Sequence, residues 1–326
     1  MKLDQIYQKW ISSIDLTKTR IVRFPSLIFL CGGPISQENN KFYSCRDIFY
    51  HYIIGSDFRF KDKIVLAENI FQFFEHSKYN NLLNFESDLA ELSVLTIIFS
   101  ESPGSIAEFG SFAVLKSVQE KLLIVMHRDD ADKNTFIWRG PALYLRDLAN
   151  KNGKENPITI YEWRKKINEK DIMTQNDFSI DDAEDLKEII ENILLKIKKT
   201  VTFQKDNLGH ILLLMLDILS VVRLATLDEI TSLLNLLGIN HSKGTVGKHL
   251  SLLPSLKLAD KKNYGNNVYY FTLSDKSWLS LAFQKNAMVR DLDRWKNEFT
   301  VYYSQKDLHK HRALYSYMIS KGLIGN

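Results

Sequence analysis

Along the first 126 residues, short apolar runs alternate with segments in which apolar side chains recur every three or four positions. The short runs predict buried strands over residues 21–31, 63–66, 94–99 and 122–126. The periodic segments between them predict helices over residues 44–54, 84–93 and 106–118. Strands that alternate with helices in this way indicate an α/β fold with a Rossmann-like, mainly parallel sheet.

The last third of the chain has a different pattern, which predicts helices followed by a hairpin. Residues 207–222 are apolar and helical, Thr226 and Glu229 have the spacing of a capping box, and a further helix begins near Lys243. Residues 256–274 then have the pattern of two strands around a Gly/Asn turn. This order is typical of a winged helix, so we expect a mainly helical, winged-helix domain at this end.

These patterns divide the chain into three parts. We expect an α/β domain in residues 1–165, a helical connector in residues 166–204 and a winged-helix-like domain in residues 205–326. The connector contains a long predicted helix, residues 179–199, which Ser179 can cap and which ends in basic residues.

Composition narrows the class of protein. Of the 326 residues, 45% are hydrophobic and 25% charged, which favours a folded globular chain over a disordered one. No apolar run approaches the roughly 18 residues of a membrane helix, and the polar start of the chain does not resemble a signal peptide. Two cysteines cannot form a disulfide framework or a four-ligand zinc site. We therefore expect a reduced, cytoplasmic protein with no membrane contact.

Charge is distributed unevenly between the two ends. Residues 1–200 contain 27 basic and 29 acidic side chains, whereas residues 201–326 contain 16 basic and 10 acidic ones. An excess of +6 in the last third indicates contact with an acidic partner such as a nucleic acid, although small excesses also occur without any function.

The most informative segment is residues 100–110, ESPGSIAEFG after Ser100, at the carboxyl end of a predicted parallel strand. Ligands bind at such strand ends in open α/β sheets. Gly104 and Ser105 precede a helix, whose free N–H groups could hold a ribose hydroxyl or a phosphate. We place Glu108 in the first turn of that helix, facing the same site. The alternative is that Glu108 only complements the helix dipole.

Cys31, Gly32 and Gly33 end the first strand, so this glycine loop should lie beside the same site or else form a plain strand-to-helix turn. The histidines are scattered without metal-ligand spacing, and we predict no metal site and no bound cofactor.

These segments together resemble a known family. LIFLCGG at residues 27–33, Glu86, and ESPGSIAEFGSFA from Glu101 are similar to the nucleoside 2-deoxyribosyltransferase-like fold. More narrowly, they resemble the effector proteins of retrons, which join such a domain to a winged-helix-like one. The specific motifs cover residues 20–130, and the remainder is similar in architecture alone.

The resemblance implies roles for particular residues. Glu108 matches the nucleophilic glutamate of the transferases, and Glu101 falls near their acidic partner. Glu68 and Asn69 match an acidic pair at the base-binding side, where one acid is missing here. The implied substrate-binding residues are Cys31, Gly32, Gly33, Glu68, Asn69, Glu86, Ser102, Gly104 and Ser105.

The resemblance also implies an activity and partners. It predicts a toxin that cleaves the N-glycosidic bond of a nucleotide, with NAD as a candidate substrate, and that acts in anti-phage defence. The retron reverse transcriptase and its msDNA, an RNA–DNA hybrid molecule, would hold the toxin inactive. Independently of the resemblance, Lys243 and Lys248 lie on the predicted recognition helix and Lys261 and Lys262 on the wing, so we expect them to contact nucleic acid, mainly at phosphates.

A different class of function fits the same chain. A winged-helix DNA-binding regulator could use the α/β domain only to sense a nucleotide, although a sensor would need no nucleophile such as Glu108. The sequence leaves open whether the winged helix contacts nucleic acid or protein. It also leaves open the base and sugar of the substrate, hydrolysis or transfer, and whether the chain forms a homo-oligomer.

Overall fold

The computed structural model describes residues 2–36, 38, 41–68, 74–75, 77–131, 134–165, 171–197, 200–274 and 276–323. The chain divides into two compact units. The α/β unit consists of Pro25–Gln72 and Asn81–Ile197, and the second unit, here the C-terminal unit, of Met1–Phe24, Phe73–Asn80 and Lys198–Asn326. This division differs from the predicted boundaries, because the first 24 residues pack with the C-terminal unit and residues up to Ile197 with the α/β unit.

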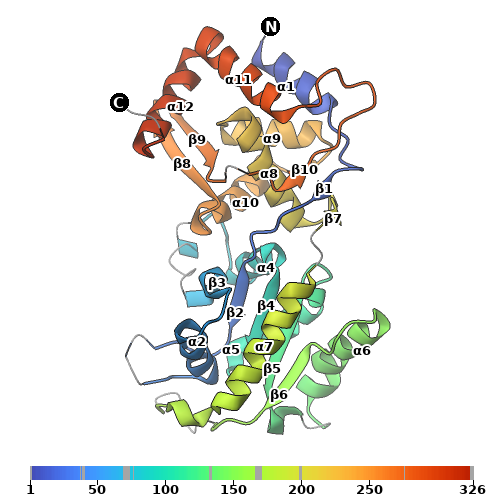
Figure 1. Ribbon diagram of the computed structural model, residues 1–326, viewed down its shortest axis with the longest axis vertical. Helices are drawn as coiled ribbons and strands as arrows, with labels where there is room; N and C mark the ends of the chain where they lie inside the picture. Colours follow the sequence, from blue (N-terminus) through green and yellow to red (C-terminus); the bar gives the residue numbers. More distant parts are fainter. Residues whose placement is uncertain are drawn as a thin grey trace. The chain divides into compact units, whose positions relative to one another are not determined.

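The α/β unit is built on a five-stranded parallel sheet (Figure 1). Its order is β3 (Ile64–Leu66), β2 (Ile28–Cys31), β4 (Leu95–Phe99), β5 (Leu122–His127) and β6 (Ile158–Tyr161). Strands β3, β4 and β5 confirm three predicted strands, and β2 confirms only the last part of the strand predicted over residues 21–31. The parallel pairing confirms an α/β fold. Strand β6 is not among the predicted strands.

The helices of this unit follow the strands in the chain. They are α2 (Cys45–Gly55), α4 (Leu82–Leu92), α5 (Pro103–Ala113), α6 (Leu143–Lys151) and α7 (Ile180–Lys196). Short helical turns are η1 (Lys61–Lys63), η2 (Gln119–Lys121), η3 (Arg128–Ala131), the π-helical η4 (Trp138–Ala142) and η5 (Gln175–Asp177).

Strands β2, β4 and β5 are buried along their whole length, as expected of a parallel sheet covered on both faces. One face carries Leu30, Ile97 and Val125, which pack in one cluster with apolar side chains of α2 and α7. Helix α7 begins where Ser179 accepts a hydrogen bond from the Asp182 amide, as predicted. It is a layer of the α/β unit and not the predicted connector, because its apolar side is needed to cover the sheet.

The C-terminal unit contains the predicted helices and hairpin. Helices α8 (Leu208–Val222), α9 (Leu227–Leu236) and α10 (Lys243–Ser255) precede strands β8 (Ala259–Tyr264) and β9 (Asn267–Thr272), followed by α11 (Leu292–Lys306) and α12 (Leu308–Ser320). Helix α1 (Leu3–Ser12) belongs to the same unit. A small sheet pairs β1 (Arg20–Ile21) with both β10 (Leu279–Ser280) and β7 (Val201–Thr202).

A buried lysine ties α1 to the end of the chain. The Lys310 ammonium lies 2.5 Å from a Glu229 carboxylate oxygen and donates to the Tyr7 hydroxyl at 3.1 Å. Tyr7 also donates to Glu229, and the Tyr303 ring lies 5.1 Å from the Lys310 ammonium. Such a charge is tolerated in a core only with a partner, so this network explains why the first residues pack with the last.

In the part of the chain that the structure describes, no helix combines the length and apolar character needed to cross a bilayer.

Candidate functional site

The candidate site lies where the strand order of the sheet reverses. Strand β2 pairs with β3 on one side and β4 on the other, so the chain leaves Cys31 and Phe99 toward opposite edges of the sheet. Ligands of open α/β sheets bind in the crevice that such a reversal leaves at the carboxyl ends of the strands. The glycine loop after β2 and the turn after β4 meet at this point.

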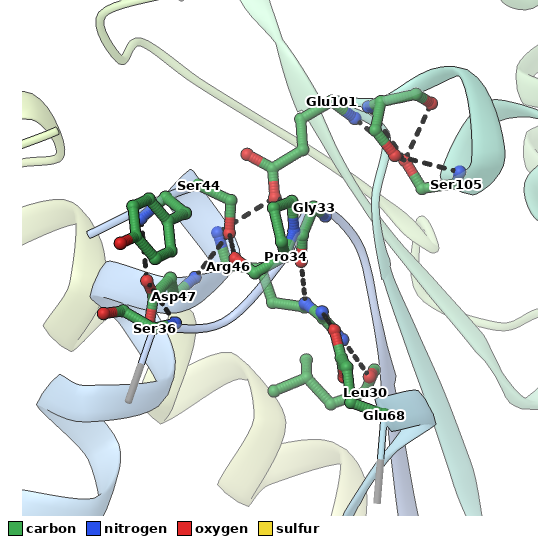
Figure 2. A network of polar contacts seen from close by, with 12 residues as sticks. Leu30, Gly33, Pro34, Ser36, Ser44, Arg46, Asp47, Glu68, Glu101 and Ser105 are labelled. Carbon is green, nitrogen blue, oxygen red and sulfur yellow. Dashed lines mark hydrogen bonds and ion pairs between the residues drawn. The ribbon is translucent and has the colours of Figure 1, made fainter. Parts of the chain in front are cut away.

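The Glu101 carboxylate joins these two loops (Figure 2). Its Oε1 accepts the amide hydrogens of Gly33 at 3.0 Å and Arg46 at 3.1 Å, and its Oε2 accepts that of Cys45 at 2.6 Å. Cys45 and Arg46 are the first residues of α2, so the carboxylate also caps a positive helix end. Burial raises the pKa of Glu101, and the three amide hydrogen bonds oppose that shift.

The Arg46 side chain holds the glycine loop through hydrogen bonds to its backbone. The side chain is 1% exposed, and it donates from Nε to the Gly33 carbonyl at 2.7 Å and from Nη1 to the Leu30 carbonyl at 2.9 Å. Its Nη2 forms an ion pair with Glu68, whose side chain remains 44% exposed (Figure 2). The guanidinium therefore fixes the end of β2 and orients one of the predicted site carboxylates.

Close packing explains both glycines of the loop. A Cβ on Gly32, whose φ is +157°, would lie 2.8 Å from Arg46 Cδ, and a Cβ on Gly33 would lie 2.5 Å from Ser44 Cβ. Contacts of that length do not occur between real side chains. The loop is thus a tight packing element, held further by the Ser44 hydroxyl, which donates to the Pro34 carbonyl.

The turn after β4 is a helix cap. Ser102 caps α5 by accepting from the Ser105 amide, and Pro103 occupies the first helical position, where its fixed φ suits a helix start. The helix therefore begins before Ile106, and Glu108 lies in its second turn and not in the first turn as predicted. The Ser105 hydroxyl accepts from the Glu101 and Ser102 amides. A Cβ on Gly104 would meet little more than the Ser102 hydroxyl, at 3.9 Å, so this side of the turn is open.

Three carboxyl groups and one thiol gather beside this turn. Burial and then the neighbouring Glu108 raise the pKa of Glu86 to about 8, with a smaller contribution from Glu68. Burial also raises the pKa of Glu108, against a hydrogen bond from the Cys31 thiol. Burial and Glu108 hold the pKa of Cys31 well above its usual range, so the thiol stays protonated. Among the described residues, Glu108 Oε2 is buried without a hydrogen-bond partner.

The structure thus brings most predicted α/β-site residues together from four segments of the chain. Those described are Cys31, Gly32, Gly33, Glu68, Glu86, Glu101, Ser102, Gly104, Ser105 and Glu108; Asn69 lies outside the described residues. Arg46 is the residue that the sequence analysis missed. Its only sequence signal is a charged residue in the first turn of a helix, which is also what a surface residue would give.

The four predicted nucleic-acid lysines have different surroundings. Lys243, at the start of α10, lies 2.6 Å from Asp228, and Lys248 lies 4.9 Å from the Tyr79 ring centre. Lys261 is exposed on β8. Lys262 points to the opposite side of the strand and donates to the Ser316 carbonyl at 2.7 Å, so it holds the hairpin to α12. Within the described residues, no cluster of His, Cys, Asp and Glu has the arrangement of a metal site.

Comparison with known proteins places the chain in a family. A family model, the STM3845 retron effector protein, matches residues 43–261, which is more than half of the chain. The chain belongs to this retron effector family. The match includes Glu68, Glu86, Glu101 and Glu108, and it continues through α10 into β8 of the C-terminal unit. This retron effector therefore functions in anti-phage defence.

Two relatives from Escherichia coli agree with that assignment. The effector is 25% identical to the "Retron Ec73 putative ribosyltransferase/DNA-binding protein" over 304 residues, which cover 88% of this chain and 87% of the relative. It is 30% identical to the "Retron Ec86 putative ribosyltransferase/DNA-binding protein" over 127 residues, or 38% of this chain and 39% of the relative.

Because the Glu101 carboxylate accepts three amide hydrogen bonds, we expect its replacement by glutamine to destabilise the fold. In Glu101→Gln one acceptor oxygen becomes an NH₂ donor that faces a backbone N–H, and a buried group left unpaired costs about 1–3 kcal/mol. We expect the free energy of unfolding of the effector, measured in urea, to fall by about 2 kcal/mol. Glu188→Gln on an exposed position of α7 is the control. The same unfolding free energy for both variants would show that the three amide hydrogen bonds of Glu101 do not stabilise the fold.

The raised pKa of Glu86 predicts an unusual pH dependence of stability. Between its ordinary value of 4.5 and about 8, the folded chain holds the Glu86 proton that the unfolded chain has lost. Stability is therefore lost as pH rises through this window, by up to about 1.4 kcal/mol per pH unit. We expect Glu86→Gln, which mimics the protonated acid, to gain stability relative to wild type as pH rises from 5 to 8. A difference in unfolding free energy between the two proteins that stays constant from pH 5 to 8 would show that the pKa of Glu86 is not raised.

Proposed function

We propose that this effector cleaves the N-glycosidic bond of a nucleotide, with Glu108 as the carboxylate that meets the sugar. The observation that carries the proposal is the buried Oε2 atom of Glu108, in the helix that follows β4. Among the described residues this atom has no hydrogen-bond partner. Leaving such an atom unpaired is costly in a folded protein. A cationic sugar carbon in the bound substrate would give it a partner.

The chemistry follows from the residue types. Cleavage of an N-glycosidic bond develops positive charge on the sugar, which a carboxylate can stabilise or capture as a covalent ester. The C–N electron pair leaves with the base, and water then hydrolyses the ester and releases Glu108. Glu108 must be ionised to act, and the Cys31 thiol hydrogen bond favours that form by lowering the pKa of Glu108.

The surrounding groups suggest a division of roles. Glu101 has both oxygens engaged by amides, so we propose a positioning role for it and not the catalytic partnership that the sequence suggests. Glu68 is partly exposed and is the better candidate to orient a hydroxyl or water. Glu86, whose pKa of about 8 keeps it protonated at neutral pH, can donate a hydrogen bond to the substrate.

NAD suits this site as the substrate. The nicotinamide ring of NAD is positively charged while it is bonded to the ribose and becomes a neutral base when it leaves. Its departure therefore needs no strong general acid. We also propose that the retron reverse transcriptase and msDNA hold the enzyme inactive. The names of both E. coli relatives include ribosyltransferase and DNA-binding, which supports a glycosyl reaction and a nucleic-acid contact.

A single substitution tests the proposed role of Glu108. The effector is incubated with NAD, nucleosides and deoxynucleotides, and the released base is identified by chromatography. We expect Glu108→Gln to lower the rate by about a thousandfold or more, because loss of a nucleophile removes several kcal/mol of transition-state stabilisation.

The matched control is Glu188→Gln, which makes the same change on an exposed position of the same unit. The thermal unfolding of both variants shows whether the fold is intact. Wild-type rates in a folded Glu108→Gln protein would remove Glu108 from the mechanism.

We further propose that α10 and the β8–β9 hairpin contact nucleic acid in the manner of a winged helix, with Lys243 and Lys261 on phosphates. The double variant Lys243→Gln, Lys261→Gln should bind a labelled DNA hairpin more weakly. The slope of log affinity against log salt should become shallower by about 0.7–0.9 for each phosphate that the variant no longer neutralises. Lys285→Gln, exposed and outside α10 and the hairpin, is the control. An unchanged slope in the double variant would leave this region as a protein-docking surface.

A further inference from the structure

A second candidate site lies within the C-terminal unit, in a surface cavity of about 370 Å³. Its wall combines Arg223, at the end of α8, with one face of α11 and with α12. Helix α11 contributes Lys296, Asn297 and Thr300, and α12 contributes Tyr315. The volume falls in the usual range for small-molecule pockets, which is roughly 300–1,000 Å³.

The backbone at Arg223 is strained. Its φ is 69° and its ψ −42°, and the Leu224 amide donates to the Val222 carbonyl at 2.8 Å, which closes a tight three-residue turn. This turn with a positive φ is the rare and strained γ-turn, which glycine would form at lower cost. The buried Tyr303 hydroxyl donates to the same Val222 carbonyl at 2.9 Å and holds the turn in place. Strain at a non-glycine residue is often kept for function.

The charges of the cavity favour an anion. Arg223 is half-buried, and among the described residues its guanidinium has no hydrogen-bond or ion-pair partner. Asp293 also lines the cavity, and its carboxylate, which is 83% exposed, is paired with Lys296 at 3.1 Å, so these two charges balance. The buried Asp217 carboxylate, which also interacts with Lys296, is already engaged by the Trp278 and Leu279 amides. The unpaired guanidinium therefore leaves a net positive charge in the cavity.

We propose that this cavity binds the phosphate monoester of a nucleotide. Arg223 offers a planar fork of donors, the geometry that phosphate oxygens accept best, and Lys296 adds a second cation. Asn297 and Thr300 supply neutral hydrogen-bonding groups. The Tyr315 ring, 48% exposed, supplies an aromatic surface for a base. This cavity belongs to the C-terminal unit and Glu108 to the α/β unit, so the C-terminal unit would bind a nucleotide independently of the Glu108 site.

The strain makes a sharp test. Arg223→Gly removes the guanidinium and also relieves the backbone, so we expect it to raise the melting temperature of the free protein while it weakens AMP binding at least tenfold. Lys257→Gly relieves another positive φ, of 55°, at a residue that does not line the cavity. This control should raise the melting temperature and leave AMP binding unchanged.

Calorimetric titrations of the full chain, carrying Glu108→Gln to prevent turnover, decide the proposal. The probes are AMP, adenosine, and a DNA dodecamer with or without a 5′-phosphate, and these distinguish a free nucleotide from a strand end. Arg223-dependent binding of AMP or of the 5′-phosphorylated strand supports the site and identifies the source. Adenosine that binds as tightly as AMP would overturn it, as would AMP and phosphorylated strand binding that Arg223→Gly leaves unchanged. Either failure leaves the Glu108 proposal untouched.

Discussion

The candidate site depends on one carboxylate. Glu101, in the turn after β4, accepts three amide hydrogens from the glycine loop and from the first turn of α2. These bonds join the two strands at which the sheet order reverses, and they bring the carboxyl ends of β2 and β4 into one rigid unit. The Ser102 cap that starts α5 follows directly in the chain. The position of Glu108 relative to Cys31 therefore follows from how Glu101 is held.

Near Glu101 the protein places several acidic side chains in buried positions, where burial disfavours their ionised form. Burial and then the neighbouring Glu108 raise the pKa of Glu86. Arg46, which forms an ion pair with Glu68, acts against the rise in the pKa of Glu108. A cluster of this kind costs stability and is typical of a site that meets positive charge or transfers protons. The chain belongs to a retron effector family. In the proposed reaction, the sugar that becomes cationic as the base leaves supplies this positive charge.

Sequence analysis could predict the features that depend on local pattern. The four buried strands, the capped helix α7 and the helices and hairpin of the C-terminal unit all have signals within a few neighbouring residues. The paired strands β1, β7 and β10 are two residues each and lie far apart in the chain, so no local period marks them. The carboxylates could be identified from a motif, but the engagement of Glu101 by amides depends on contacts 55 to 68 residues away. Arg46 was missed for the same reason.

The central claim is that the Glu108 carboxylate bonds to the sugar carbon when the base leaves. A 2′-fluorinated analogue of NAD slows both steps of such a reaction and lets a covalent ester accumulate. Mass spectrometry of the intact protein, followed by peptide mapping, should find one added fluorinated ADP-ribosyl group, which is the analogue without its nicotinamide, on the peptide that contains Glu108 and none in Glu108→Gln. A label on Glu68 or Glu86, or release of nicotinamide from the analogue with no label on the protein, would contradict the account.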